Sequence, residues 1–138
     1  MHRALGCVYV ASCVLLAGCD STSPSDGPPP EAAIITGGYT RVFEDYTVFL
    51  RFTPDPGATQ QGTTSIHFAF LNGDTVDLSG YYMTRSEGDD NLVRLLDESC
   101  ANEGRYFYTV DALSLSFRLA TDTCARSREL PGAWERQP

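Results

Sequence analysis

Histidine and cysteine are the side chains with which this chain of 138 residues could do nucleophilic, acid–base or metal chemistry, and it has two histidines and five cysteines. His67 is the histidine of the globular part, where Ile66 and Phe68 flank it, and no serine stands in a Gly-x-Ser-x-Gly turn. We therefore expect His67 to be a half-buried strand residue rather than part of a catalytic triad. One histidine and two cysteines are too few ligands for zinc, so we expect no metal and no cofactor.

Carboxylates could support calcium binding or acid–base catalysis. The segment 87–91, Glu-Gly-Asp-Asp-Asn, is rich in oxygen ligands but lacks the spacing of an EF-hand loop. Asp74 with Asp77, or Glu44 with Asp45, could be pictured as a pair for glycoside hydrolysis. Acidic loop residues more often face water, so we interpret all of these as solvated turns and expect that the protein is not an enzyme.

The N-terminal residues have the composition of an export signal. His2 and Arg3 precede the apolar run Ala4–Ala17, and Asp20 ends the apolar character at once. A membrane-spanning helix needs about 20 apolar residues, so we interpret residues 1–18 as a signal peptide. Its last residues and the next one, Leu16-Ala17-Gly18-Cys19, resemble the lipobox of bacterial lipoproteins. The alternative is an ordinary secretory signal that leaves Cys19 as a free thiol.

The lipobox resemblance implies a cellular location and a lipid anchor. It implies that Cys19 becomes the new N-terminus, carries acyl chains and attaches the protein to a lipid bilayer of the bacterial cell envelope, facing the periplasm or the cell surface. Two or three acyl chains hold a protein far more firmly than one myristoyl chain. Asp20 resembles the signal that retains lipoproteins in the inner membrane of enteric bacteria, but the choice of membrane stays open.

The composition indicates a short tether followed by one domain, and it argues against nucleic acid as a partner. Residues 19–31 contain the cysteine to be acylated and a Pro/Ser-rich stretch that favours extended chain, and residues 32–138 have the size of a single domain. The formal net charge is −8, and every basic residue except the histidines is arginine. No basic cluster is present, which argues against nucleic acid as a partner.

Hydrophobic residues in the domain recur with period two, and Gly, Pro, Asn and Asp interrupt them every eight to twelve residues. This pattern is typical of an all-β domain, and we find no convincing helix. Short turns favour an antiparallel up-and-down β-barrel of eight strands, with a two-sheet β-sandwich as the alternative. The expected strands are 34–42, 46–52, 64–71, 75–84, 92–96, 105–110, 113–119 and 133–136.

The last long hairpin predicts a disulfide. Leu113, Leu115, Phe117 and Leu119 alternate with polar residues, and a short turn at Asp111-Ala112 would set Val110 opposite Leu113; a longer loop there is the alternative, because Ala112 disfavours the tightest turn. Extending this pairing places Cys100 next to Cys124. Cys7 and Cys13 leave with the signal and Cys19 is acylated, so these two thiols are the ones left to pair in an oxidising compartment. Two buried thiols or a redox pair are the alternatives.

The C-terminal residues resemble a known class of barrel. The shared pattern is Cys100-x3-Gly104-x-Tyr106-x-Tyr108, Leu113-x-Leu115, Asp122-x-Cys124-x-Arg126 and Leu130-x3-Trp134-x-Arg136. It is similar to small secreted bacterial proteins described as lipocalin-like, and the resemblance implies a barrel that holds an apolar ligand. Alternation puts Trp134 and Arg136 on one face, where a guanidinium can stack on an indole, and we expect these two residues to have a structural role rather than a binding one.

Two functions remain open. In the first, the barrel binds a small apolar ligand through inward-pointing aromatic residues, for which the candidates are Tyr82, Tyr106, Tyr108 and Phe117. In the second, the barrel is solid and acts as an interaction or inhibitor module for a basic protein partner, with the polar loop 53–61 as a presenting element. A cavity of about 300 Å³ or more would favour the ligand, and its absence would favour the partner.

Overall fold

The domain is a closed, all-antiparallel barrel in a computed structural model that describes residues 31–138. The predicted signal peptide, Cys19 and all but the last residue of the tether lie outside the described residues. The strands are β1 (Gly37–Val42), β2 (Tyr46–Pro54), β3 (Gln61–Phe70), β4 (Thr75–Glu87), β5 (Asp90–Asp97), β6 (Cys100–Val110), β7 (Ser114–Thr121) and β8 (Gly132–Arg136).

Neighbours in sequence are neighbours in the sheet. Each strand pairs with the next, and β8 closes the barrel by pairing with β1 through Tyr39 opposite Arg136 and Thr40 opposite Glu135. The expected eight-stranded up-and-down barrel is therefore confirmed, and the sandwich alternative is wrong. No strand edge is left open along the sheet, so the domain is a self-contained unit.

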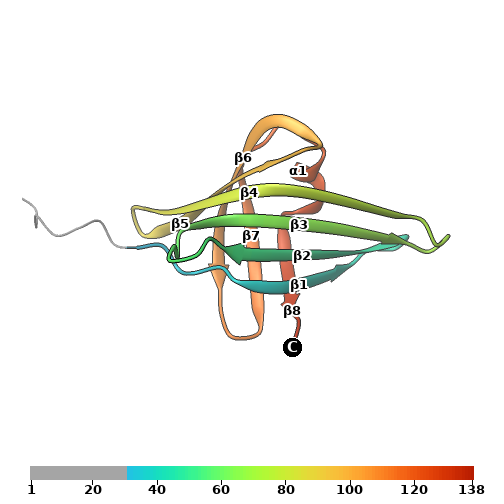
Figure 1. The fold of residues 1–138 in the computed structure, drawn as a ribbon, viewed down its shortest axis with the longest axis horizontal. Helices are drawn as coiled ribbons and strands as arrows, with labels where there is room; N and C mark the ends of the chain where they lie inside the picture. Colours follow the sequence, from blue (N-terminus) through green and yellow to red (C-terminus); the bar gives the residue numbers. More distant parts are fainter. Residues whose placement is uncertain (1–30) are drawn as a thin grey trace, which may run out of the picture.

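The barrel is flattened, because β1 to β4 run side by side while β6 to β8 cross them (Figure 1). The long strand β4 contains Gly80, which is buried and lies opposite Asp97 on β5. A Cβ atom at Gly80 would collide with the main chain of Leu96 and Asp97 on β5. Glycine is required at this position because the two backbones approach each other so closely.

Alternation determines the core, as expected. Val48, Leu50 and Phe52 on β2 point inward and are at most 1% exposed, and the residues between them face outward. Tyr39 and Trp134 are fully buried on β1 and β8. Aromatic and aliphatic side chains thus fill the middle of the barrel.

The N-terminal segment 31–36 plugs one end of the barrel, where the sequence predicted the start of a strand. β1 begins at Gly37, whose φ of 90° turns the preceding chain out of the sheet. Ile35 is fully buried and Ala32 nearly so. The strand prediction was wrong for residues 34–36 because Ile35 reaches the core from a crossing segment rather than from a sheet, while Ile34 and Thr36 are exposed.

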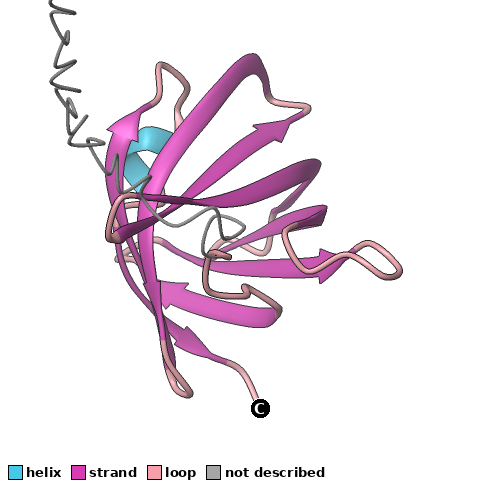
Figure 2. Cartoon of the chain, turned by 90° about the vertical axis from the view of Figure 1, so that its left-hand side faces the viewer, coloured by secondary structure: helices cyan, strands magenta, loops and turns pink. Residues whose placement is uncertain are grey.

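The opposite end carries the only helix of the described residues, the single turn α1 (Arg126–Glu129), which Figure 2 shows in cyan. The sequence predicted no helix, and this was wrong: a turn of four residues is too short to display a period of 3.6. It rests on main-chain bonds such as Leu130 N–H to Arg126 O, 2.9 Å. No helix within residues 31–138 is long and apolar enough to cross a membrane.

The β6–β7 hairpin has the expected buried face but a different register. Val110 lies opposite Leu115 and Tyr108 opposite Phe117, a shift of two residues from the predicted pairing. The cause is the longer loop 111–113, in which the Asp111 carboxylate accepts hydrogen bonds from the Leu113 and Ser114 N–H groups, 2.7 Å each. Leu113, predicted to be buried, is therefore 79% exposed, and Leu119 is 42% exposed.

Candidate functional site

The four aromatic residues predicted to bind a ligand lie in the packed core. Tyr82, Tyr106, Tyr108 and Phe117 are each at most 3% exposed. The Tyr82 hydroxyl donates to Ile35 O at 3.4 Å and the Tyr108 hydroxyl to Ala33 O, both on the N-terminal plug. Burial raises the pKa of Tyr108 to about 12. These hydroxyls bond the chain's own groups, and the apolar cavity described next has a different lining.

An apolar cavity of about 260 Å³ lies at the other end of the barrel, which we call the mouth. Strands β2, β3 and β4 form one wall, and the β7–β8 connection with α1 forms the other. The lining residues are Tyr46, Val48, Ile66, Phe68, Phe70, Val76, Leu78, Ser99, Ala125, Arg126, Glu129, Leu130 and Trp134. Most of them are aliphatic or aromatic, as in small-molecule sites generally.

The cavity has a closed apolar bottom and an open rim. Val48, Leu130 and Trp134 at the bottom are at most 1% exposed. At the rim Val76 is 44% exposed, and Phe70, Tyr46 and Glu129 are partly exposed. A molecule entering from solvent would therefore place its apolar part deep and its polar part at the rim.

Glu129 is the only carboxylate among the residues that line this cavity. Burial raises its pKa above the usual value, while Tyr46 and Arg128 act in the opposite direction. Burial likewise raises the pKa of Tyr46, and the negative charge of Glu129 adds to that rise. The rim thus combines a phenol and a poorly hydrated acid.

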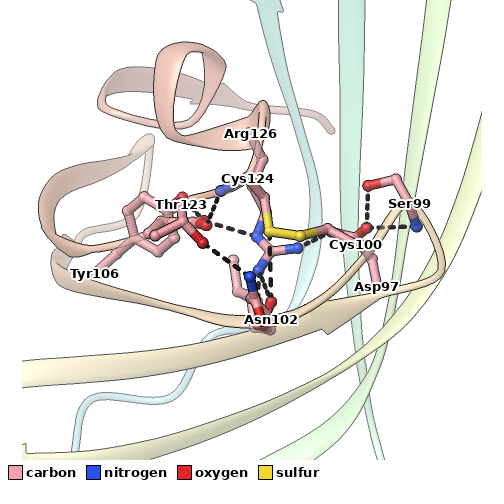
Figure 3. The surroundings of a disulfide bond; sticks show 10 residues. Asp97, Ser99, Cys100, Asn102, Tyr106, Thr123, Cys124 and Arg126 are labelled. Carbon is pink, nitrogen blue, oxygen red and sulfur yellow. Dashed lines mark hydrogen bonds and ion pairs between the residues drawn. A yellow bond between two sulfur atoms is a disulfide. The ribbon is translucent and has the colours of Figure 1, made fainter.

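Arg126 is the second charged residue of the lining, and its charge is already compensated. Its guanidinium forms ion pairs with Asp97, 2.7 Å from Nη1 to Oδ2, and with Asp122, 2.7 Å from Nε to Oδ2. It also donates to Asn102 O, and the Tyr106 hydroxyl donates to Asp122 (Figure 3). All three charged side chains are at most 4% exposed. The network attaches α1 to β5 and β6.

Hydrogen bonds from Ser99 and Arg126 keep Asp97 ionised in spite of its burial. Burial is the largest single influence and would raise the pKa of Asp97, but hydrogen bonds from Ser99 and Arg126 outweigh it and hold that pKa below its usual value. Gly104 makes room for the network, because a Cβ atom there would lie 2.9 Å from Arg126 Nε and collide with Asp122. Asp97 is therefore ionised at neutral pH and contributes a negative charge to the network that attaches α1 to β5 and β6.

The predicted disulfide between Cys100 and Cys124 is confirmed. It joins the start of β6 to the segment before α1, with the two Cα atoms 6.1 Å apart (Figure 3). Together with Arg126, it holds the β7–β8 connection over the mouth.

Trp134 and Arg136 do share one face of β8, but they do not stack on each other. The Arg136 guanidinium lies over the Tyr39 ring, 5.2 Å from its centroid, and donates to the Tyr39 hydroxyl at 2.8 Å. Trp134 instead points into the core, where its indole N–H donates to Leu130 O at 2.9 Å. The stacking does not form because β1, which closes the barrel beside β8, supplies a nearer aromatic ring.

The remaining chemistry-bearing residues lie on the outer surface. His67 is half-buried on the outer face of β3, with Nδ1 2.6 Å from Asp77 Oδ1. Asp74 accepts from Asn72 at 2.6 Å within the β3–β4 turn, and Glu87 pairs with Arg85 at 2.7 Å. Within residues 31–138 no group of three His, Cys, Asp or Glu side chains could hold a metal ion.

A larger hollow of about 590 Å³ lies over β3, β4 and β5, and it is mostly built from side chains of the outer face. Its lining combines the hydroxyl-bearing residues Ser65, Ser79 and Thr63 with Tyr81 and Leu96. It is a surface depression rather than the interior of the barrel.

The fold places this protein in the class of eight-stranded up-and-down β-barrels. No family model, no curated protein and no solved structure matches the chain.

Sequence reasoning missed Tyr46, Leu130 and Glu129 as parts of a site. Tyr46 is the first residue of β2, and Glu129 is the last residue of a helix too short to show a helical period in the sequence. The two residues come together only when the β7–β8 connection folds across the mouth. The Leu130-x3-Trp134 spacing was the one available signal, and it indicated the C-terminal wall of the cavity.

Proposed function

We propose that this protein is an envelope lipoprotein, anchored through acylated Cys19, whose barrel binds a small apolar ligand at its mouth. The observation that carries the proposal is the apolar cavity of about 260 Å³, closed at the bottom and open at the rim. Its volume lies just below the value of about 300 Å³ that was set to separate the two functions, so the volume alone does not favour a ligand. The apolar lining and the closed bottom do favour one, and the volume requires it to be compact.

The position of the cavity supports this proposal. The chain enters the barrel through the plug 31–36, whose partners Gln60 and Asn91 lie at the end opposite the mouth. The proposed anchor precedes the plug and therefore joins the domain at the end away from the mouth. A ligand would then reach the site from the aqueous side.

Trp134 offers a direct test, because it is the only tryptophan of the chain and lines the cavity. We expect the domain, prepared as residues 19–138 with Ser in place of Cys19, to change its tryptophan emission when 1-octanol enters the site. Native mass spectrometry should show one bound molecule. An unchanged spectrum up to saturating octanol, with no adduct, would count against ligand binding.

A rim substitution makes this test specific. Val76→Phe adds bulk at the half-exposed rim and should weaken octanol binding by about tenfold or more without lowering stability. Val42→Phe makes the same change on a side chain that is 76% exposed and absent from the lining, and it should leave binding unchanged. Equal effects of the two substitutions would point to nonspecific partitioning.

One observation favours the alternative function, an interaction module. Tyr81 and Leu96 lie opposite each other on β4 and β5, and with Met83 they form an exposed apolar strip on an acidic protein. Tyr81→Ser should abolish binding of a basic protein partner if this strip is the contact surface, and it should leave octanol binding intact. Loss of octanol binding would contradict that separation.

A further inference from the structure

The rim of the cavity carries information about the head group of its ligand. Two charged residues belong to the lining, Arg126 and Glu129, and their situations differ. Arg126 is compensated twice, by Asp97 and Asp122, with ion-pair distances of 2.7 Å. Its positive charge is therefore not free to bind an anion.

Glu129 has no such partner among the ion pairs of the described residues. It is partly buried beside an apolar wall, where an ionised carboxylate is poorly solvated, and the upward pKa shift of Glu129 has burial as its largest cause. A cation that arrives with the ligand would offset that cost and form a charge-assisted hydrogen bond.

Two other arginines lie near this rim, and neither forms an ion pair with Glu129, although the charge of Arg128 opposes the rise of the pKa of Glu129. The Arg41 guanidinium donates to the main-chain oxygens of Glu129, 3.2 Å, and Pro131, and it lies 4.8 Å from the Phe43 ring centroid. Arg41 is not part of the cavity lining, and Arg128 is exposed on the outer side of α1. Glu129 thus remains the one charged group of the lining that a ligand's head could pair with.

We infer that the ligand is an amine: a compact apolar body that fills the bottom of the cavity, with a protonated nitrogen that binds Glu129 and the Tyr46 hydroxyl at the rim. This inference rests on the proposed function and adds the chemical class of the ligand. Carboxylate-bearing amphiphiles of equal length are disfavoured, because their head would meet Glu129 and the field of a protein with a formal net charge of −8.

Three probes with the same chain length separate these alternatives: octylamine, 1-octanol and octanoate. Binding to residues 19–138 with Ser in place of Cys19 is followed at pH 7 by Trp134 emission and by calorimetry. We expect octylamine to bind about tenfold more tightly than octanol, the gain of one charge-assisted hydrogen bond, and octanoate to bind most weakly.

A matched pair of variants assigns the preference to the rim. Glu129→Gln should remove the preference for octylamine, so that octylamine and octanol bind this variant with affinities within about twofold of each other. Glu135→Gln removes the same charge from an exposed position on the outer face of β8 and should keep the preference. Retention of the preference in Glu129→Gln, or its loss in both variants, would overturn the assignment.

The outcomes also separate this inference from the proposed function. Equal binding of octanol and octylamine to the unaltered domain would refute the amine and leave the apolar site standing. No binding of any of the three probes would refute the apolar site itself.

Discussion

The two ends of this barrel are closed in different ways. At the tether end, the plug 31–36 inserts Ile35 into the core and bonds its carbonyl groups to the hydroxyls of Tyr82 and Tyr108. At the mouth, Arg126 and the disulfide attach the single helical turn α1 to β5 and β6 and hold it above the core. A plug of extended chain fills the space that it closes, whereas a helix supported by long side chains leaves a cavity beneath it.

The difference also separates two kinds of stabilising interaction. The plug depends on apolar burial and neutral hydrogen bonds, which respond weakly to pH and not at all to reductants. The mouth depends on buried ion pairs and a covalent bond. Stability measurements can therefore separate the two ends.

The largest effect is expected from Arg126→Ala. The substitution leaves Asp97 and Asp122 buried without a cation, which costs about 3–5 kcal/mol of unfolding free energy. Denaturant unfolding measures it. Arg128→Ala removes an exposed arginine from the same helical turn and should change the unfolding free energy by no more than about 0.5 kcal/mol. Similar losses in both variants would mean that the buried network is not what holds α1.

Removal of the disulfide should follow closely. Cys100→Ser combined with Cys124→Ser opens a loop with a sequence separation of 24, worth about 3.5 kcal/mol on the chain-entropy account. A reductant should destabilise the unaltered domain to a similar degree and leave the double variant unchanged. A further loss in the double variant on reduction would contradict the assignment, because no other cysteine lies within residues 31–138.

Ile35→Ala tests the tether end and should cost about 3 kcal/mol, because a fully buried side chain leaves a cavity there. Its neighbour Ile34 is 46% exposed, so Ile34→Ala should cost much less. Octanol binding at the mouth should be unchanged in both folded variants. Altered octanol binding in Ile35→Ala would show that the two ends are coupled.

The smallest expected effect is the change in unfolding free energy that the mouth contributes on acidification. The pKa of Asp97 is lower in the folded state than its usual value of 3.8, so its ionisation stabilises the fold above that value, and this contribution is lost as the pH falls through the folded-state pKa. The unfolding free energy of Asp97→Asn should therefore fall less on acidification from pH 6 to pH 2. Asp89→Asn, exposed in the β4–β5 turn, should behave like the unaltered domain.

Glu129 should act in the opposite direction. Its pKa is raised, so its contribution to stability is present below the usual value of 4.5 and is lost as the pH rises through the folded-state pKa. Glu129→Gln should accordingly make the loss of stability on acidification steeper. A shallower loss would mean that Glu129 is not a desolvated acid.

Local patterning was a good guide to the strands and a poor one to their connections. Leu115 and Phe117 were assigned to the correct face because alternation is a local property of an extended chain. The register of the same hairpin was wrong by two residues, since it depends on how the Asp111 carboxylate bonds the loop. Residues 34–36 were assigned to a strand because an apolar plug and an apolar strand have the same composition.

The amino-acid sequence by itself favoured an all-β barrel of eight strands with one disulfide, because period-two alternation, turn residues and the two cysteines of residues 31–138 are local or countable features. Only the tertiary structure decided where the cavity lies. The cavity and its one carboxylate, Glu129, arise where β2, β3 and β4 face the β7–β8 connection. The compensation of Arg126 arises where that connection meets β5 and β6. Volume and charge pairing are properties of side chains far apart in the chain, and no local pattern encodes them.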